Sequence, residues 1–404
     1  MAKSKKEQQN NIVLDAENRT DGLAALVAKK LNKKFDGGNQ LVYFLGEPEC
    51  SPTDIPGWVS SGATLMDIAV ANQVNGGFPI GKIVELQGLS SSGKSLVGAH
   101  VLASMQKQGG IAVFIDTENS ASREFLNVIG VNLEDLIYIS PPPELNTVED
   151  IYQMIEDTII MVRENDKNTP MVILLDSLSA ASTRLEMESA ADGKKDGFKK
   201  DGWSTAKALV NSKAMRKLPP LFAREKVLFV VTNQLKHKMD AVWGDQYTTP
   251  GGLAIGYHSH IRIRLQQAAT IKDANGMVTG NYIKAKVLKN KVAPPFKEVA
   301  FPLYYESGIH DDLSLFYFLK DNNMMQASGA WYTLKAPCLQ NKDGESQEQI
   351  KFQAKSWCDI LDDNPGLREY VIQIISDKLH TTYRKRTKED VAQDNIVDEL
   401  QPDD

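Results

Sequence analysis

The sequence predicts an α/β protein with a mostly parallel central sheet flanked by helices. Four short apolar runs recur along the middle of the chain, and segments with helical periodicity separate them. Polar residues follow each run at once, as at the ligand-binding edge of an open parallel sheet. With 404 residues, the chain is long enough for one large core and several appended segments.

The four runs have the composition of strands that are buried on both faces. Their consecutive apolar residues, many of them β-branched or aromatic, fit such strands. The runs are IVEL at 83–86, IAVFI at 111–115, MVILL at 171–175 and VLFVV at 227–231. The polar clusters that follow them lie at 88–95, 116–118, 176–177 and 232–234. Because parallel strands bring their carboxyl ends to one edge, we expect the four clusters to form one site.

The rest of the chain divides into appended segments. We expect a disordered N-terminus at 1–20, a helix with a linker at 21–54, the main α/β core at 55–335, a small C-terminal α/β domain at 336–386 and an acidic disordered tail at 387–404. The N-terminal helix has an apolar stripe but is too short to be stable alone. The stripe therefore packs either on its own core or on a neighbouring subunit.

Composition and charge exclude several classes. No apolar run approaches the ~20 residues that span a bilayer, and the start of the chain lacks the apolar stretch of a secretory signal, so we expect no membrane role. The three cysteines have no metal-ligand spacing, which favours a reducing, cytoplasmic setting. A net charge of −6 argues against wholesale electrostatic binding of nucleic acid, but it leaves room for a local basic surface.

The first polar cluster, GLSSSGKS, has the pattern of a phosphate-binding loop. Its glycines let backbone N–H groups turn inward around phosphate oxygens, and the helix that follows directs its N-terminal dipole at the same anion. We expect Lys94 to reach the β and γ phosphates of ATP and the Ser95 hydroxyl to bind Mg²⁺. The predicted nucleotide loop comprises Gly88, Leu89, Ser90, Ser91, Ser92, Gly93, Lys94, Ser95 and Leu96.

Side chains at the other strand ends supply the remaining parts of the predicted site. Asp176 is expected to hold Mg²⁺ through water, with helix capping as the alternative. Glu118 is a candidate general base for the water that attacks the γ phosphate, but Asp116 is another, and either could be a solvated strand end. Gln234 could sense the γ phosphate or be simply solvated.

Two glycine-containing loops combine lysine with aromatic residues, as in proteins that bind single-stranded nucleic acid. The first, at 188–206, carries Lys194, Lys195, Lys199, Lys200 and Trp203. Interleaved aspartates offset much of its charge, so a solvated surface loop is the alternative. The second, at 235–252, carries Lys236, Lys238, Trp243, Gly251 and Gly252. It starts directly after Gln234, which gives ATP a route to order it.

These stretches together resemble the bacterial RecA recombinase family, in the divergent form that phages encode. The matching segments include GGFPIGKIVELQGLSSSGKS, VFIDTENS, VILLDSLSAAS, FVVTNQLKHK, TTPGG, KVLKNKVAPPFK and GAWYTLK, and the resemblance covers roughly residues 21–375. It implies a RecA-like phosphate-loop ATPase with ATP and Mg²⁺ as cofactors. It also implies a homo-oligomeric filament on single-stranded DNA that pairs with homologous duplex and exchanges strands. Single-strand-binding and loader proteins are expected as further partners.

The resemblance also implies roles for individual residues. It supports Glu118 as the base and Gln234 as the sensor. It adds Lys289 and Lys291, which would reach the γ phosphate of a neighbouring subunit. Further DNA contacts are implied for Ser212, Arg216 and Trp243, and adenine stacking for Phe125, where the family usually has tyrosine.

The chain departs from the family pattern near both loops. Its first loop is longer, Tyr247 replaces an acidic residue and Gly256 a basic one. These changes leave open how tightly DNA binding and ATP turnover are coupled.

Two other classes of protein are alternatives. A ring-forming helicase shares the ATPase core, but it would need an arginine finger and a separate collar or primase-binding domain, and the core here begins within about sixty residues. A regulatory ATP-dependent assembly protein would not bind DNA. The lysine-rich first loop and the small C-terminal module weigh against it.

Overall fold

The computed structural model describes residues 22–35, 42–44, 51, 53–191, 203–237, 247–252, 254–340 and 345–384. These belong to two compact units, Met1–Pro56 and Gly57–Asp404. In the first unit, α1 (Leu23–Lys34) forms where the apolar stripe predicts a helix. The stripe residues Leu23 and Leu26 are 73% and 53% exposed. The segments predicted to be disordered, 1–20 and 387–404, lie outside the described residues.

The second unit contains the predicted sheet. Its nine strands lie in the order β13-β12-β11-β10-β3-β7-β6-β4-β5. The six strands from β10 to β5 pair in parallel, and β11, β12 and β13 extend the sheet in antiparallel fashion. Their bounds are β3 Ile83–Gly88, β4 Ile111–Asp116, β5 Leu136–Ile139, β6 Met171–Asp176, β7 Val227–Gln234, β10 Ile261–Lys272, β11 Val278–Asn290, β12 Glu298–Tyr304 and β13 Gly308–Ile309.

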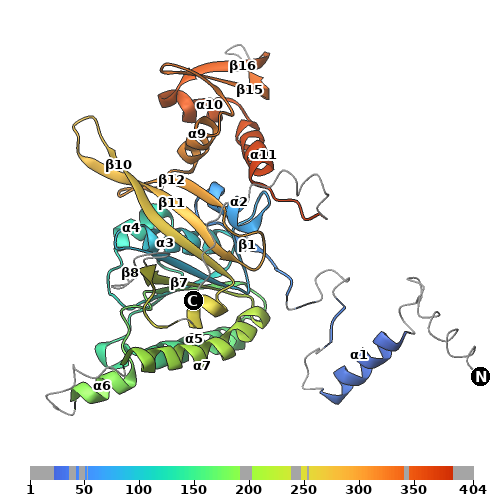
Figure 1. The fold of residues 1–404 in the computed structure, drawn as a ribbon, viewed down its shortest axis with the longest axis vertical. Coiled ribbons are helices and arrows are strands. Elements are labelled where there is room, and N and C mark those ends of the chain that lie inside the picture. The colour runs from blue at the N-terminus through green and yellow to red at the C-terminus, as the bar shows by residue number, and fades with distance from the viewer. Residues whose placement is uncertain are drawn as a thin grey trace, which may run out of the picture. The chain divides into compact units, whose positions relative to one another are not determined.

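Helices cover both faces of this sheet, which explains why its strands are apolar on consecutive residues (Figure 1). In β6, Val172 and Leu174 pack into the core beneath α3 (Lys94–Lys107), while Ile173 and Leu175 pack on the opposite side against α5 (Val148–Asn165) and α7 (Trp203–Arg224). The predicted α/β architecture with a mostly parallel sheet is therefore confirmed.

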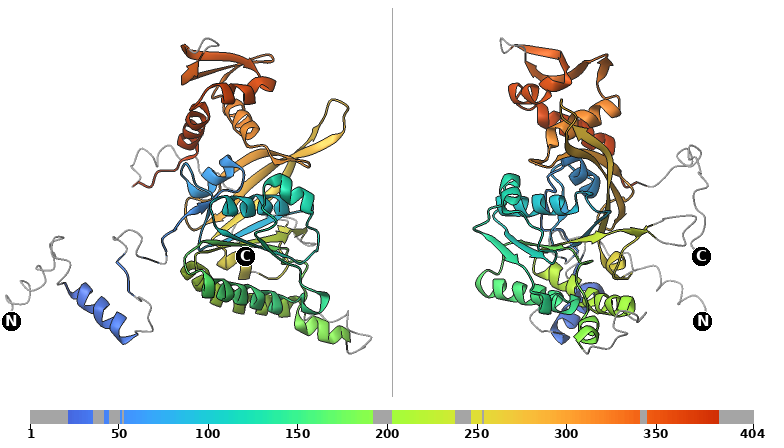
Figure 2. Two further views of the ribbon diagram at one scale, coloured as in Figure 1. Left: turned by 180° about the vertical axis from the view of Figure 1, so that it is seen from behind. Right: turned by 90° about the vertical axis from the view of Figure 1, so that its left-hand side faces the viewer.

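The remaining elements of the second unit are short or lie at its periphery. A long hairpin formed by β10 and β11 extends beyond the helical layers, as both Figures 1 and 2 show. The shorter elements are β1 Trp58–Val59, α2 Thr64–Ala71, β2 Phe78–Pro79, α4 Arg123–Ile129, the 3-10 turn Pro143–Leu145, α6 Arg184–Ala191, β8 Lys236–His237, β9 Tyr247–Thr248 and α8 Ala254–His258.

A small C-terminal lobe follows the sheet. It contains α9 (Asp311–Asp321), a three-stranded sheet of β14 (Gln326–Ser328), β15 (Trp331–Gln340) and β16 (Ser346–Gln353), the 3-10 turn Ala354–Ser356, and the helices α10 (Trp357–Asp363) and α11 (Leu367–Leu379). Trp357 is fully buried, and its indole donates a hydrogen bond of 2.7 Å to the carbonyl of Asp312. The predicted domain boundary between residues 335 and 336 falls inside β15. The three-stranded sheet of the lobe begins before that point, with β14.

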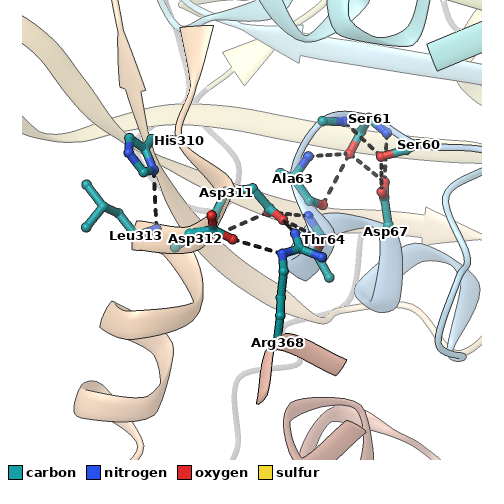
Figure 3. Close-up of polar contacts among 12 residues, drawn as sticks. Ser60, Ser61, Ala63, Thr64, Asp67, His310, Asp311, Asp312, Leu313 and Arg368 are labelled. Atoms are coloured by element: carbon teal, nitrogen blue, oxygen red, sulfur yellow. Dashed lines mark hydrogen bonds and ion pairs between the residues drawn. The ribbon is translucent and has the colours of Figure 1, made fainter. Parts of the chain in front are cut away.

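Polar contacts join α2, α9 and α11 where the lobe meets the core (Figure 3). The carboxylate of Asp311 accepts hydrogen bonds from the backbone N–H and the hydroxyl of Thr64, at 2.7 and 2.6 Å, and it pairs with Arg368. Beside it, the buried Asp67 accepts hydrogen bonds from Ser60 and Ser61. Burial raises the pKa of Asp67 to about 7.

Candidate functional site

The phosphate loop occupies the turn between β3 and α3, as the sequence predicts. A Cβ atom added to Gly88 would lie 2.2 Å from the hydroxyl oxygen of Ser92, and Gly93 has a φ of +88°, which side chains disfavour. Only glycine therefore fits at the two ends of the turn. The Ser92 hydroxyl is buried without a hydrogen-bond partner among the described residues. Because buried polar groups are normally hydrogen-bonded, this fits a loop that binds a further polar group.

Lys94 opens α3 beside this loop. Its ammonium group donates hydrogen bonds to the carbonyls of Gly88 and Leu89, at 3.2 and 2.8 Å. Burial lowers the pKa of Lys94, and the nearby carboxylates of Asp176 and Glu118 act in the opposite direction. The structure thus brings together a lysine, two carboxylates and the loop that the sequence places far apart.

Asp176 ends β6 next to the same loop. Its carboxylate accepts hydrogen bonds from the hydroxyls of Ser95 and Thr232, the latter at 2.5 Å. Burial raises the pKa of Asp176. A hydroxyl and a carboxylate next to a phosphate loop are oxygen donors of the kind that Mg²⁺ prefers, so these residues fit a bound Mg²⁺ and nucleotide.

The two acidic residues after β4 have different surroundings. Asp116 is fully buried, and its carboxylate accepts hydrogen bonds from the N–H groups of Glu118, Ser120 and Ala121 and from the hydroxyl of Tyr138, at 2.9–3.1 Å. It holds the turn in place. Glu118 is exposed and accepts a hydrogen bond of 2.5 Å from the Ser177 hydroxyl. Of the two, Glu118 is the carboxylate that solvent can reach.

Gln234 lies directly beside the start of the phosphate loop. Parallel pairing of β3 with β7 places Gly88 opposite Gln234, and the Leu235 N–H donates to the Gly88 carbonyl at 3.0 Å. Gln234 is exposed. The strands β8 and β9 then form the base of the second loop, where the rings of His237 and Tyr247 lie 4.6 Å apart.

The structure describes only part of the two predicted DNA loops. Ser212 and Arg216 lie one turn apart on α7, Arg216 is exposed, and Lys236 is exposed in β8. Phe125 is partly buried in α4. Outside the described residues lie Lys194, Lys195, Lys199, Lys200, Lys238 and Trp243, together with the side chain of Trp203.

Lys291 lies near the edge of the sheet opposite the phosphate loop, and Lys289 lies level with Glu85 in the middle of β3. The Lys291 N–H donates to the His260 carbonyl, and the His260 N–H donates to that of Ile83, both at 2.9 Å. Lys291 is therefore level with the first residue of β3, and the loop follows its last residue, about 16 Å further on at about 3.3 Å per residue. Burial is the main cause that lowers the pKa of Lys289, to about 8.

Sequence reasoning missed several residues that shape this site. Ser177 was seen only as part of a polar cluster, yet it positions Glu118. Glu85 is fully buried and pairs with Arg262 at 2.6 Å, and Asn233, next to Gln234, donates to the same carboxylate at 3.1 Å. A charged residue within the apolar run IVEL was the available signal, since a buried charge needs a partner.

The sheet, the loop between β3 and α3, and the carboxylates at the neighbouring strand ends define a phosphate-loop ATPase. Comparison with known proteins narrows this class. Residues 23–310 match the model of the RecA N-terminal domain, and the chain therefore belongs to the RecA family. It is a RecA-type recombinase and a DNA-dependent ATPase. Family membership also implies DNA binding, filament formation and the use of ATP with Mg²⁺.

Relatives match over nearly their whole length. Protein RecA of Lactobacillus delbrueckii subsp. bulgaricus is 34% identical over 84% of this chain and 94% of its own length. Protein RecA of Halalkalibacterium halodurans is 33% identical over 87% of this chain and 90% of its own length. Protein RecA of Corynebacterium aurimucosum is 32% identical over 98% of this chain and 94% of its own length. These matches favour the recombinase over the ring helicase and the assembly protein. The phage origin stays a prediction. In the described part of the chain, no helix has the length and apolarity to cross a membrane.

Proposed function

We propose that this recombinase binds ATP and Mg²⁺ at the loop 88–96 and uses them to assemble on single-stranded DNA, which it pairs with homologous duplex. The observation that carries the proposal is the gathering of Lys94, Asp176, Glu118 and Gln234 at one sheet edge, beside the loop. The phosphates would bind at the turn between β3 and α3, where only glycine fits at positions 88 and 93.

Each of these residues has a distinct task in the proposal. Lys94 neutralises phosphate charge, and Ser95 and Asp176 hold the ion, Asp176 through water. When bound, Mg²⁺ supplies charge stabilisation at the phosphate oxygens. Glu118, oriented by Ser177, accepts a proton from the attacking water. Phe125 stacks on the adenine, and Asp116 keeps the turn that presents Glu118.

The position of Lys289 and Lys291 supports a site shared between two copies of the chain. Along the sheet, Lys291 lies about 16 Å and Lys289 about 10 Å from their own phosphate loop, which places them to serve the loop of a neighbour. Such a cation stabilises the charge that develops during phosphoryl transfer. In the single copy the Lys289 ammonium donates hydrogen bonds to the carbonyls of Gly256 and Tyr257, at 2.8 and 2.7 Å, and it would have to leave them to reach a neighbour's phosphate.

DNA contact is assigned to the two loops and the elements that bear them. The proposed contacts are Lys194, Lys195, Lys199, Lys200, Trp203, Ser212, Arg216, Lys236, Lys238, Trp243, Gly251 and Gly252. Gln234 would report the γ phosphate to the second loop, which starts next to it. Single-strand-binding and loader proteins are proposed as partners, and a cytoplasmic location fits the free cysteines Cys338 and Cys358.

Electron microscopy and an electrophoretic shift with single-stranded DNA test the proposal. Filaments and a shifted band should form with a non-hydrolysable ATP analogue and weaken without nucleotide. Lys94→Ala should abolish both, while Lys107→Ala, at the far end of the same helix, should keep them. If the unaltered protein binds no DNA both with and without the ATP analogue, the proposal is refuted.

A further inference from the structure

Glu118 is oriented by a segment that also reaches the helix of the first DNA loop. The hydroxyl of Ser177 donates to the Glu118 carboxylate at 2.5 Å and lies 2.6 Å from the Ser179 hydroxyl. Ser177 itself is buried, and its backbone exchanges hydrogen bonds of 2.7 and 2.9 Å with the Thr117 hydroxyl. The direction of the Glu118 carboxylate therefore depends on the path of the backbone at residues 177–179.

Lys207 fixes that backbone from α7. Its ammonium group donates hydrogen bonds to the carbonyls of Ala181 and Ser179, at 2.6 and 3.3 Å. Lys207 lies in the second turn of α7, the helix that follows the first DNA loop. Any displacement of the start of α7 consequently acts on the segment that holds Glu118.

Asn211, one turn further along α7, fixes the end of the second DNA loop. It is fully buried, its amide nitrogen donates to the Gly251 carbonyl at 2.7 Å, and its amide oxygen accepts from the Tyr152 hydroxyl at 2.9 Å. A Cβ atom on Gly251 would lie only 2.7 Å from that amide nitrogen. The second loop thus closes directly against the helix that begins at the first.

We propose that Lys207 and Asn211 form a latch on α7 that transmits DNA binding at both loops to the orientation of Glu118. Residues four apart share one face of a helix, so α7 carries both contacts as a rigid unit. Losing a partner is costly for the buried amide of Asn211 and for the partly buried ammonium of Lys207, so α7 transmits a movement of either loop. The inference rests on the proposed roles of Glu118 and of the loops. It makes Lys207 and Asn211 positioning residues.

The test compares ATP turnover of the full chain with and without saturating single-stranded DNA. The latch predicts that Lys207→Met and Asn211→Leu each lower DNA-stimulated kcat by about tenfold, within the range usual for coupling between sites. Turnover without DNA should fall much less than stimulated turnover, and the KM for ATP and the dissociation constant for DNA should stay as in the unaltered protein. Lys207→Arg, which can still donate to both carbonyls, should recover most of the stimulation.

Matched variants separate the latch from loss of charge or of folding. Lys213→Met removes an exposed lysine from the same helix and should keep the stimulated kcat at saturating DNA. Tyr152→Phe removes only the hydroxyl that orients Asn211. It should lower stimulation about fivefold, at the weak end of the same coupling range, even where the stronger variants fail to fold.

The outcomes are distinct. If the unaltered protein shows no stimulation by DNA, the proposed function fails before the latch is tested. If it is stimulated, then undiminished stimulation in the Lys207, Asn211 and Tyr152 variants overturns the latch. An equal loss with and without DNA, or a loss of DNA affinity alone, overturns it as well.

Discussion

Replacing Arg262 by methionine tests how far the fold depends on the ion pair between β3 and β10. The Glu85 carboxylate is fully buried and accepts hydrogen bonds from Arg262 at 2.6 Å and from Asn233 at 3.1 Å. Arg262→Met removes the charged donor and leaves the amide. Arg262 also fills the space at Gly256, where an added Cβ would lie 2.9 Å from its guanidinium carbon. The variant therefore leaves the buried carboxylate of Glu85 without a cationic partner and opens a gap beneath α8.

Loss of one partner from a buried ion pair costs about 3–5 kcal/mol. With an unfolding entropy of about 2.1 cal/mol/K per residue and a unit of about 350 residues, each kcal/mol lowers the thermal midpoint by about 1.4 °C. The expected fall is thus about 4–7 °C. Glu85→Gln combined with Arg262→Met removes both charges and should recover most of the loss, because a neutral amide costs less to bury.

Urea unfolding followed by circular dichroism, together with thermal melts, measures these changes. Arg224→Met serves as the control, since its side chain is 60% exposed and its pair with Glu225 should contribute at most about 1 kcal/mol. A loss below about 1 kcal/mol for Arg262→Met, or a double variant no more stable than the single one, would contradict the reasoning.

Three further predictions concern the shared site, pH dependence and packing. Lys289→Ala with Lys291→Ala should leave nucleotide binding by dilute protein intact and lower DNA-stimulated hydrolysis about 100-fold, the loss typical when a charge-stabilising group is removed; unchanged stimulation in a steady-state assay would exclude the shared site. Burial lowers the pKa of His100 from 6.5 to about 4, so only the unfolded chain gains a proton between these values and acid destabilises the fold. His100→Gln should reduce the slope of unfolding free energy against pH in that window by about 1.4 kcal/mol per pH unit, and equal slopes in urea titrations at several pH values would refute this. Gly62→Ala should lower stability by about 1–3 kcal/mol, because its Cβ would lie 2.7 Å from His100; Gly109→Ala has a similar positive φ but nothing within 4 Å, and equal losses in thermal melts would show that packing is not the cause.

The sequence predicts the central strands well because each is apolar on consecutive residues. β3, β4, β6 and β7 all begin where their runs begin, and each continues one to three residues into the polar cluster. The hairpin of β10 and β11 was not predicted. In β10 buried residues alternate with Arg262 and Arg264, and the outer half of the strand is exposed. Such a segment lacks the continuous apolar run that identified the others.

The site was predictable in its parts but not in its connections. The sequence alone favoured Glu118 over Asp116 as the base only weakly, because both follow the same strand. The fold distinguishes them. The carboxylate of Asp116 accepts hydrogen bonds that hold the turn, whereas that of Glu118 accepts one from Ser177, which lies 59 residues further along the chain. No local pattern reports such a contact. The pairing of Asn211 with Gly251 is hidden for the same reason.

The separation of the phosphate loop from Lys291 along β3 has a consequence for how activity would scale with assembly. If each loop needs the lysines of an adjoining copy, a row of n copies contains n−1 complete sites, and one terminal copy always lacks a partner. A lone molecule would then hold nucleotide without consuming it, and turnover per molecule would approach its ceiling only as rows lengthen. The rate of phosphate release per molecule would therefore rise as rows grow and fall as they break, because the terminal copy of each row does not hydrolyse ATP.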